Sequence, residues 1–282
     1  MEEWVDFQGK GGKLVGILAA PDGQAAPLDC VVFIHGWTGY RIGPHRIIVK
    51  IARDLAANGV ASLRFDLRGR GDSQGDPDAT TLDDMIADTC VAVDVVSRRF
   101  PASRLTLWGI CSGGNVAIGT ATLRNQAHKL VLLSTLPFIP QKKTGEKLAR
   151  TTSYAGGYLR KALRPATWKK LFKGAVDFGS IRKVLFGHYR PAGGERDKKD
   201  SARDVMADFR HYRGDALFIY GGADPEAVDA RAHYEAFTRE AGIPSRTVVI
   251  EGSNHDFYSL AWEDQIAGLT RDWIRAAGRA ET

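Results

Sequence analysis

Long hydrophobic runs and cysteines are scarce in this sequence. Only 3 of its 282 residues are cysteines, too few and too widely spaced for a disulfide framework or a zinc site. Two of them, Cys30 and Cys90, lie in apolar patterns and are expected in the core. No apolar stretch approaches the roughly 20 residues that cross a bilayer, and the first residues lack the basic and apolar regions of a secretory signal. We therefore expect a cytoplasmic protein without a transmembrane segment, in a reducing compartment that keeps thiols free.

Acidic residues are scarce in one part of the chain, residues 137–213, which hold 19 lysines and arginines against 7 aspartates and glutamates. The rest of the chain holds 20 basic and 26 acidic residues, so the net charge of +6 combines a basic segment with an acidic body. Such a segment requires its own explanation. Its aromatic residues are placed like core and lid residues, so we expect no nucleic-acid partner.

Short apolar runs alternate with helical patterns along most of the chain. The predicted strands are 30–34, 60–65, 105–110, 129–134, 216–221 and 246–251, after a hairpin at 4–20. The predicted helices are 46–58, 81–99, 113–124, 226–241 and 260–277. This alternation predicts an α/β fold with a mostly parallel, doubly wound sheet and helices on both faces.

One predicted strand ends in an abrupt run of small residues before the next helix. Gly109 and Gly113 lie two residues before and after Cys111, where a strained strand-to-helix corner needs small side chains because the two backbones approach closely. With Ser112 at the corner, the first of these positions would be Ile110, whose branched side chain would crowd the turn. We therefore predict Cys111 as a nucleophile. In the alternative, Cys111 is a small buried hydrophobe and Ser112 caps the helix.

Two polar side chains follow later strands at their carboxyl ends, where the chemistry of parallel α/β sheets is found. Asp224 comes directly after the strand that ends at Gly221, and Asp229, inside the next helix, is the alternative acid. A turn or helix-capping role is the other interpretation of Asp224. Of the 7 histidines, only His255 lies just past the last strand. Asp224 and His255 are therefore the candidates for an orienting acid and a general base.

With these residues the sequence resembles the α/β-hydrolase superfamily over nearly the whole chain. The likeness is carried by the His-Gly at 35–36, the Gly-Ile-Cys-Ser-Gly at 109–113, Asp224 and His255. It implies the α/β-hydrolase fold and a catalytic triad in the chain order nucleophile, acid, histidine.

The resemblance also implies a role for each site residue. Cys111 would attack a carbonyl carbon, and His255 would take up the thiol proton and deliver one to the leaving group. Asp224 would fix the imidazole tautomer and favour its charged form. The backbone N–H groups of Trp37 and Ser112 would form the oxyanion hole.

A narrower likeness, to bacterial exosortase-associated hydrolases, covers residues 10–187. It is carried by residues 39–46, 63–66, 71–73 and 158–178, and the elbow of those hydrolases also has cysteine. The full His-Gly at 35–36 and the Ser-Gly at 112–113 differ from them. Dienelactone hydrolases and polyhydroxyalkanoate synthases share a cysteine elbow, although this chain is too short to resemble a whole synthase.

The basic segment 137–213 is expected as a mainly helical cap inserted into an α/β-hydrolase core of residues 1–136 and 214–282. Such enzymes carry a lid at this point between two strands. The side chains or backbone expected to bind the substrate are those of His35, Gly36, Tyr158, Trp168 and Phe172. The positive charge would capture an acyl group bound to coenzyme A or to an acyl carrier protein. A solvated helix face and peripheral contact with a membrane are the alternatives.

These features predict a cysteine-dependent acyl hydrolase or acyltransferase that acts on a small-molecule carboxylic ester or thioester through an acyl-Cys111 intermediate. We expect no metal and no cofactor. The alternative is a non-catalytic binding protein of the same fold that holds an acidic partner with its basic cap. Haloalkane and epoxide chemistry are disfavoured because they need a carboxylate at the corner. The charged, glycine-rich turn at 66–73 lacks the Lys-Ser end of a phosphate-binding loop and is predicted to be structural.

Overall fold

The computed structural model describes residues 1–22, 29–101, 103–124, 127–138 and 201–276. These residues belong to one compact unit, Met1–Phe138 together with Lys198–Thr282. Of the expected cap, 137–138 and 201–213 are described, and the latter contain the short helix α7 (Val205–Phe209). The division of the chain into core and cap stays a prediction.

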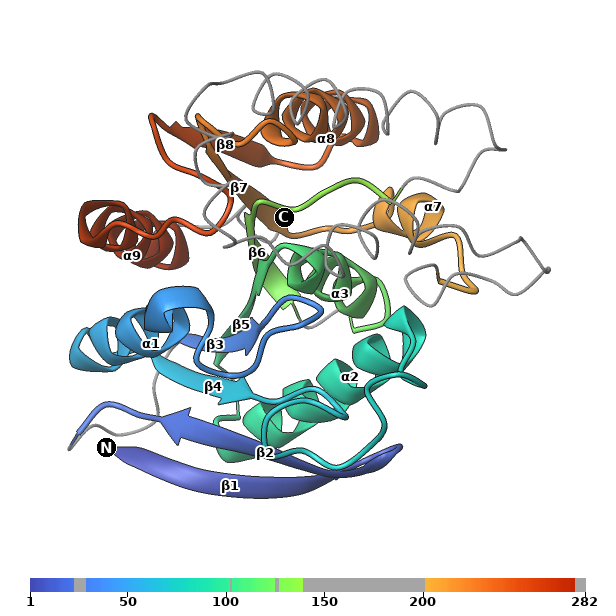
Figure 1. Cartoon of the computed structure of the whole chain (residues 1–282), viewed down its shortest axis with the longest axis vertical. Helices are drawn as coiled ribbons and strands as arrows, with labels where there is room; N and C mark the ends of the chain where they lie inside the picture. The colour runs from blue at the N-terminus through green and yellow to red at the C-terminus, as the bar shows by residue number, and fades with distance from the viewer. Residues whose placement is uncertain (23–28, 102, 125–126, 139–200, 277–282) are drawn as a thin grey trace, which may run out of the picture. The chain divides into compact units, whose positions relative to one another are not determined.

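In the described residues, eight strands form one sheet in the order β1-β2-β4-β3-β5-β6-β7-β8 (Figure 1). The strands are β1 Glu2–Gly9, β2 Gly12–Ala19, β3 Asp29–Ile34, β4 Ala61–Phe65, β5 Arg104–Ile110, β6 Ala127–Leu133, β7 Asp215–Gly221 and β8 Ser245–Ile250. In the part of the sheet from β4 through β3, β5, β6 and β7 to β8, all neighbouring strands are parallel. The strands β1 and β2 form an antiparallel hairpin, and β2 pairs antiparallel with β4. The predicted hairpin and the mostly parallel sheet are confirmed.

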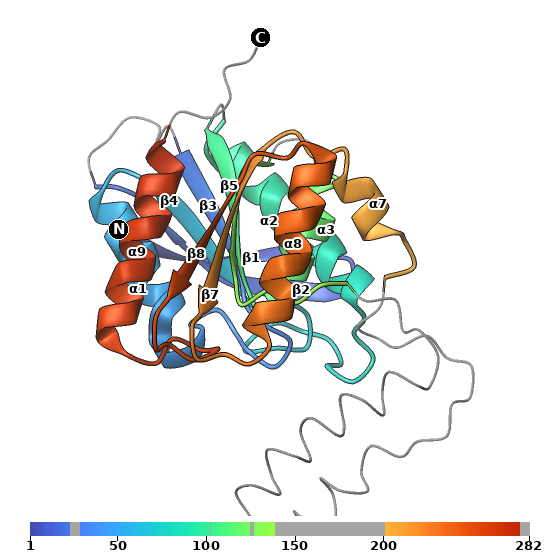
Figure 2. The ribbon, with the colours of Figure 1, turned by 90° about the horizontal axis from the view of Figure 1, so that it is seen from above.

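Helices cover both faces of the sheet (Figures 1 and 2). Their bounds are α1 Ile47–Ala57, α2 Leu82–Arg99, α3 Ser112–Ala121, α8 Ala227–Ala241 and α9 Leu260–Arg275, with a 3-10 turn, η1 Pro44–Arg46, before α1. The apolar faces of α1 and α9 contribute to one core, and those of α2, α3 and α8 to a second core on the other side. The doubly wound arrangement predicted from the alternation of strands and helices is therefore present.

The central strand β3 is apolar at every position after Asp29. All six of its residues are buried. Val31 and Phe33 face the core beneath α1 and α9, whereas Cys30, Val32 and Ile34 face the core beneath α2 and α3. Because side chains alternate along a strand, a strand covered on both faces needs an apolar side chain at almost every position.

The carboxyl ends of β3, β5, β7 and β8 lie at the same edge of the sheet because these strands are parallel. Ile34 at the end of β3 is level with Gly109 on β5, and Gly221 at the end of β7 is level with Ile250 on β8. The described site residues predicted from the sequence lie in the loops that leave this edge, apart from Ser112, which begins α3 (Ser112–Ala121).

Candidate active site

Cys111 forms a sharp backbone corner between β5 and α3. Its φ of 55° and ψ of −127° are a strained conformation that costs a non-glycine residue about 1–3 kcal/mol. A Cβ on Gly109 would lie 2.4 Å from the carbonyl oxygen of Gly113, and a Cβ on Gly113 would lie 2.3 Å from that of Ile34. Neither position has space for a side chain. The backbone thus places Cys111 at the corner and not Ser112, as the spacing of the glycines predicts.

Ser112 is the first residue of α3, and α3 has no side-chain cap. The alternative in which Ser112 caps this helix is therefore wrong. The Ser112 Oγ instead accepts the backbone N–H of Trp37, with an N–O distance of 2.6 Å. Gly36 lies against the same corner, since a Cβ on it would be 3.5 Å from the Cys111 Cβ and 3.8 Å from the Ser112 Oγ. The loop after β3 is thus in contact with the corner after β5.

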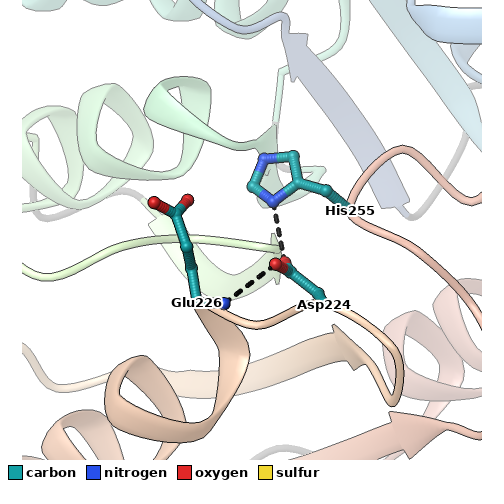
Figure 3. Close-up of side chains that lie close together, drawn as sticks. All are labelled: Asp224, Glu226 and His255. Carbon is teal, nitrogen blue, oxygen red and sulfur yellow. Dashed lines mark hydrogen bonds and ion pairs between the residues drawn. The ribbon is translucent and has the colours of Figure 1, made fainter. Parts of the chain in front are cut away.

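Asp224 and His255 meet across the loops that follow β7 and β8 (Figure 3). The Nδ1–H of His255 donates to the Oδ2 of Asp224 at 2.8 Å. The Asp224 side chain is 3% exposed and the His255 side chain 27%. The other carboxylate oxygen of Asp224 accepts the backbone N–H of Glu226 at 3.1 Å. Asp224 is thus buried and fixed, and the second ring nitrogen of His255 points away from it (Figure 3).

Two further hydrogen bonds hold the histidine loop in place. The hydroxyl of Ser134, which follows β6, donates to the backbone carbonyl of His255 at 2.9 Å. The N–H of Ala223 donates to the carbonyl of Ser253 at 2.8 Å, which joins the loop after β7 to the loop after β8. Sequence reasoning did not find Ser134. Its position directly after an apolar run, like those of Asp224 and His255, was the available signal.

Cys111 and His255 each shift the pKa of the other group. Burial raises the pKa of the Cys111 thiol, but the hydrogen bond and the positive charge of His255 lower it, and the N–H and hydroxyl of Ser112 lower it further, so the net pKa lies below the ordinary value. The hydrogen bond with Cys111 is the main cause that raises the pKa of His255 to about 9 against the effect of burial, and Asp224 contributes in the same direction. Each group therefore stabilises the charged form of the other, the thiolate of Cys111 and the imidazolium of His255.

His35 has a structural place in the loop after β3. Its side chain is buried, its Nδ1–H donates to the carbonyl of Gly36 at 2.8 Å, and its Nε2 accepts the N–H of Leu67 at 3.1 Å. Burial lowers the pKa of His35 to about 4, so the ring is neutral. Both ring nitrogens are engaged within the protein. The substrate contact expected of His35 stays a prediction, and it concerns the backbone of this residue.

The turn at 66–73 braces the loop that approaches Cys111. The Nε of Arg70 donates to the carbonyl of Trp37 at 2.6 Å, and its guanidinium lies 5.9 Å from the centre of the Trp37 ring. The backbone N–H of Arg41 donates to Asp66 at 2.7 Å, and the Arg41 guanidinium also contacts Asp66 and Asp72. The predicted structural role of this turn is consistent with these contacts. Arg41 and Arg70 were not among the residues predicted from the sequence. Their positions in two glycine-rich loops were the feature that could have indicated a structural role.

The remaining predicted residues fall into two groups. Cys30 and Cys90 are buried as expected, and burial raises the pKa of both thiols, that of Cys30 to about 12. The alternative acid, Asp229, is exposed in the first turn of α8 and Asp224 is paired with His255 instead. The predicted substrate contacts of the cap lie outside the described residues, namely Tyr158, Trp168 and Phe172.

Among the described residues, one group has the composition of a metal site, formed by Asp224, Glu226 and His255. Their ligand atoms lie within 4.8 Å of one another (Figure 3). Asp224 and His255 already share a hydrogen bond, so a cation here would compete with that pairing.

The family of this protein follows from a comparison with known sequences. Residues 31–269 match the alpha/beta hydrolase family, which is most of the chain. The chain belongs to this family. Over 87 residues it is 32% identical to the lysophosphatidylserine lipase ABHD12 of Danio rerio, a stretch that covers 31% of this chain and 22% of that protein.

Solved structures of α/β hydrolases share the fold of this member of the family. The dienelactone hydrolase of Anabaena variabilis has 17% sequence identity and a TM-score of 0.63, with 97% of this chain and 96% of that chain covered. Est1E of Butyrivibrio proteoclasticus, solved with bound ferulic acid, has 18% identity and a TM-score of 0.63, with 96% of this chain and all of that chain (100%) covered. At this level of identity the likeness concerns the fold. In the described part of the chain, no helix combines the length and apolar character of a membrane span.

Proposed function

We propose that this α/β hydrolase acts on a carboxylic ester or thioester, as a hydrolase or an acyltransferase, with Cys111 as its nucleophile. The observation that carries the proposal is the hydrogen bond from His255 to the buried Asp224, together with the interaction of His255 and Cys111 that lowers the pKa of the thiol and raises that of the imidazole. The thiol is half-buried at a strained corner, its pKa is lowered, and the imidazole next to it is oriented by a buried carboxylate. This is the arrangement of nucleophile, base and orienting acid that acyl transfer requires.

In the first step, the Cys111 thiolate attacks the carbonyl carbon and forms a carbon–sulfur bond, while the π electron pair moves to the carbonyl oxygen. The backbone N–H groups of Trp37 and Ser112 donate to this oxygen as its negative charge develops. The intermediate then collapses, the bond to the leaving alcohol or thiol breaks, and the imidazolium of His255 protonates the leaving group. An acyl-Cys111 thioester remains, with neutral His255.

In the second step, an acceptor attacks the carbonyl carbon of the acyl-Cys111 thioester. His255 takes the proton of the acceptor, and the carbon–sulfur bond breaks to return the Cys111 thiolate. Asp224 holds the Nδ1–H of His255, so the other ring nitrogen is the one that exchanges protons with the reactants. Water as acceptor gives hydrolysis, and an amine or thiol gives acyl transfer.

The comparisons support an ester-type substrate. A lysophosphatidylserine lipase is among the relatives in sequence, and a structure with bound ferulic acid is among those that share the fold. The cysteine at the corner extends this proposal to thioesters, because thiolate and thioester exchange readily. We propose that the basic segment 137–213 binds an acidic acyl donor such as acyl-coenzyme A or an acyl carrier protein.

A panel of acyl esters and acyl thioesters, tested with and without added amines, measures the proposed reaction. We expect intact-mass spectra to show a covalent acyl adduct that Cys111→Ala abolishes and that Cys30→Ala retains. Release of free acid identifies hydrolysis, and an amide product identifies transfer. If no donor gives an adduct, and iodoacetamide alkylates Cys111 no faster than it alkylates Cys30 and Cys90, the chain is a binding protein of the same fold.

A further inference from the structure

The backbone N–H of Trp37, proposed above as an oxyanion donor, already has an acceptor in the free protein. Its nitrogen lies 2.6 Å from the Ser112 Oγ, at the short end for an N–H···O hydrogen bond. The contact joins residues 75 positions apart in the sequence. It therefore results from the placement of the β3 loop against the β5 corner and is not a local feature of the helix.

The same hydroxyl belongs to the residue that directly follows the nucleophile. Gly36 is close to both groups, because a Cβ on it would be 3.5 Å from the Cys111 Cβ and 3.8 Å from the Ser112 Oγ. A serine hydroxyl can accept one hydrogen bond through a lone pair and donate its own hydrogen at the same time. Having accepted the N–H of Trp37, the Ser112 hydroxyl still has its hydrogen to donate to the neighbouring sulfur, a contact that acts to lower the pKa of Cys111.

We propose that the Ser112 hydroxyl occupies the oxyanion position of the free protein, where it bridges the Trp37 N–H and the Cys111 sulfur, and that the carbonyl oxygen of the acyl donor displaces it. The proposal rests on the proposed function, because it needs Cys111 as the nucleophile. In the free protein, the bridge keeps the Trp37 N–H paired and favours the thiolate. In the acyl complex, the oxygen of the donor takes over the N–H.

Displacement needs only a rotation of one side chain. The Ser112 side chain is half-buried, and serine has three staggered positions about its Cα–Cβ bond. The hydroxyl can therefore leave the Trp37 N–H without any backbone movement, and the incoming oxygen leaves no donor unpaired. Ser112 would thus be a positioning residue for the thiolate, in addition to the backbone N–H that it supplies.

The first test is the pH dependence of Cys111 alkylation by iodoacetamide in wild type, Ser112→Ala and Ser112→Thr. A hydrogen bond to a charged group is worth roughly one pH unit or more, so we expect Ser112→Ala to move the midpoint up by about that much. Ser112→Thr, which keeps a hydroxyl, should restore it. Equal midpoints for wild type and Ser112→Ala would overturn the proposal. If Ser112→Ala does not fold, Ser112→Gly removes the same hydroxyl.

The second test follows the Trp37 amide proton by NMR of protein labelled with ¹⁵N-tryptophan. We expect a strongly downfield signal in wild type that moves upfield in Ser112→Ala. Hexanal adds to the Cys111 thiol to form a thiohemiacetal, with no leaving group, and should return the signal downfield in that variant. An unchanged signal in Ser112→Ala, or no return with hexanal, contradicts the proposal.

The two tests separate this inference from the proposed function. Alkylation requires no acyl donor, so a shifted midpoint without any acyl adduct would refute the acyl transfer alone. Acyl adducts at Cys111 together with an unshifted midpoint would refute the bridge alone.

Discussion

Replacement of His255 by alanine removes the group on which the reactivity of Cys111 depends. In the wild type, the hydrogen bond and charge of His255 lower the pKa of Cys111 against the opposing effect of burial. Without the imidazole, burial raises the pKa of this thiol, and only the contacts of Ser112 oppose it. We therefore expect His255→Ala to raise the pKa of Cys111 and to shift this residue from the thiolate toward a protonated and poorly reactive thiol.

The size of this effect follows from the titration of His255. Its pKa rises from 6.5 to about 9, which at 1.36 kcal/mol per unit favours the imidazolium by about 3 kcal/mol. Cys111 is the main cause of the rise, burial opposes it, and Asp224 raises the pKa further. Because the coupling between two groups is reciprocal, the share of Cys111 is also the stabilisation of its thiolate. Loss of His255 should lower alkylation at pH 7 by up to roughly 100-fold.

The assay is the rate of carbamidomethylation by iodoacetamide between pH 5 and pH 10, followed by intact mass and assigned by peptide mapping. Cys30 and Cys90 are buried, with pKa values above the ordinary range, and provide slow internal references. His211→Ala is the matched control, since His211 is an exposed histidine that follows α7. In this variant, Cys111 should be carbamidomethylated at the wild-type rate.

Two results would refute this reasoning. The first is an equal rate at pH 7 for wild type and His255→Ala, which would mean that the imidazole does not act on the sulfur. The second is a wild-type profile with the midpoint of an ordinary thiol, at about pH 8.5. Above about pH 9, where His255 loses its proton, alkylation should stay high while acyl transfer to an added amine declines, because the imidazolium that protonates the leaving group is gone.

Three further predictions concern the residues around this pair. Asp224→Asn should lower the rate of acyl-adduct formation by roughly 10²- to 10⁴-fold and leave the melting temperature within a few degrees; an unchanged rate would exclude Asp224 as the orienting acid. Arg70→Lys loses the hydrogen bond at 2.6 Å to the Trp37 carbonyl. This loosens an oxyanion donor and should lower kcat roughly 10-fold or more, with KM little changed. A roughly tenfold increase of KM with an unchanged kcat would contradict this. The depressed pKa of His35, about 4 against 6.5, means that the unfolded chain binds a proton that the folded state does not. Stability contributed by this group is therefore present above pH 6.5 and lost as pH falls toward 4, by about 3 kcal/mol. Urea unfolding of wild type and His35→Gln should show a flatter pH dependence in the variant, and parallel curves would refute the assignment.

Several features of the fold could be predicted because they depend on neighbours in the sequence. The continuous apolar run that became β3 predicts a strand buried on both faces, and all six residues of β3 are buried. The boundaries of strands and helices were less well predicted, because the residue at which an element begins or ends depends on tertiary contacts. The strand expected at 129–134 is β6, Ala127–Leu133, and the helix expected at 113–124 is α3, Ser112–Ala121.

The site was predicted to different degrees for the same reason. The sequence by itself determined the frame of the corner through Gly109, because a side chain there would clash with the nearby backbone of Gly113 and Gly114. Gly113 is required for a tertiary reason, because a side chain there would meet the backbone of Ile34 and His35 at the end of β3. The order of strands along the chain also brought Asp224 and His255 to one edge of a parallel sheet.

Only the tertiary structure decided which side chains pair across that edge. Two hydrogen bonds join loops that follow different strands, namely Trp37 N–H to Ser112 and Arg70 to the Trp37 carbonyl. The burial of His35 likewise depends on segments that are distant in the sequence. Such contacts depend on the relative placement of loops after separate strands, to within about an ångström. Residue type and spacing along a single segment carry no information on that placement.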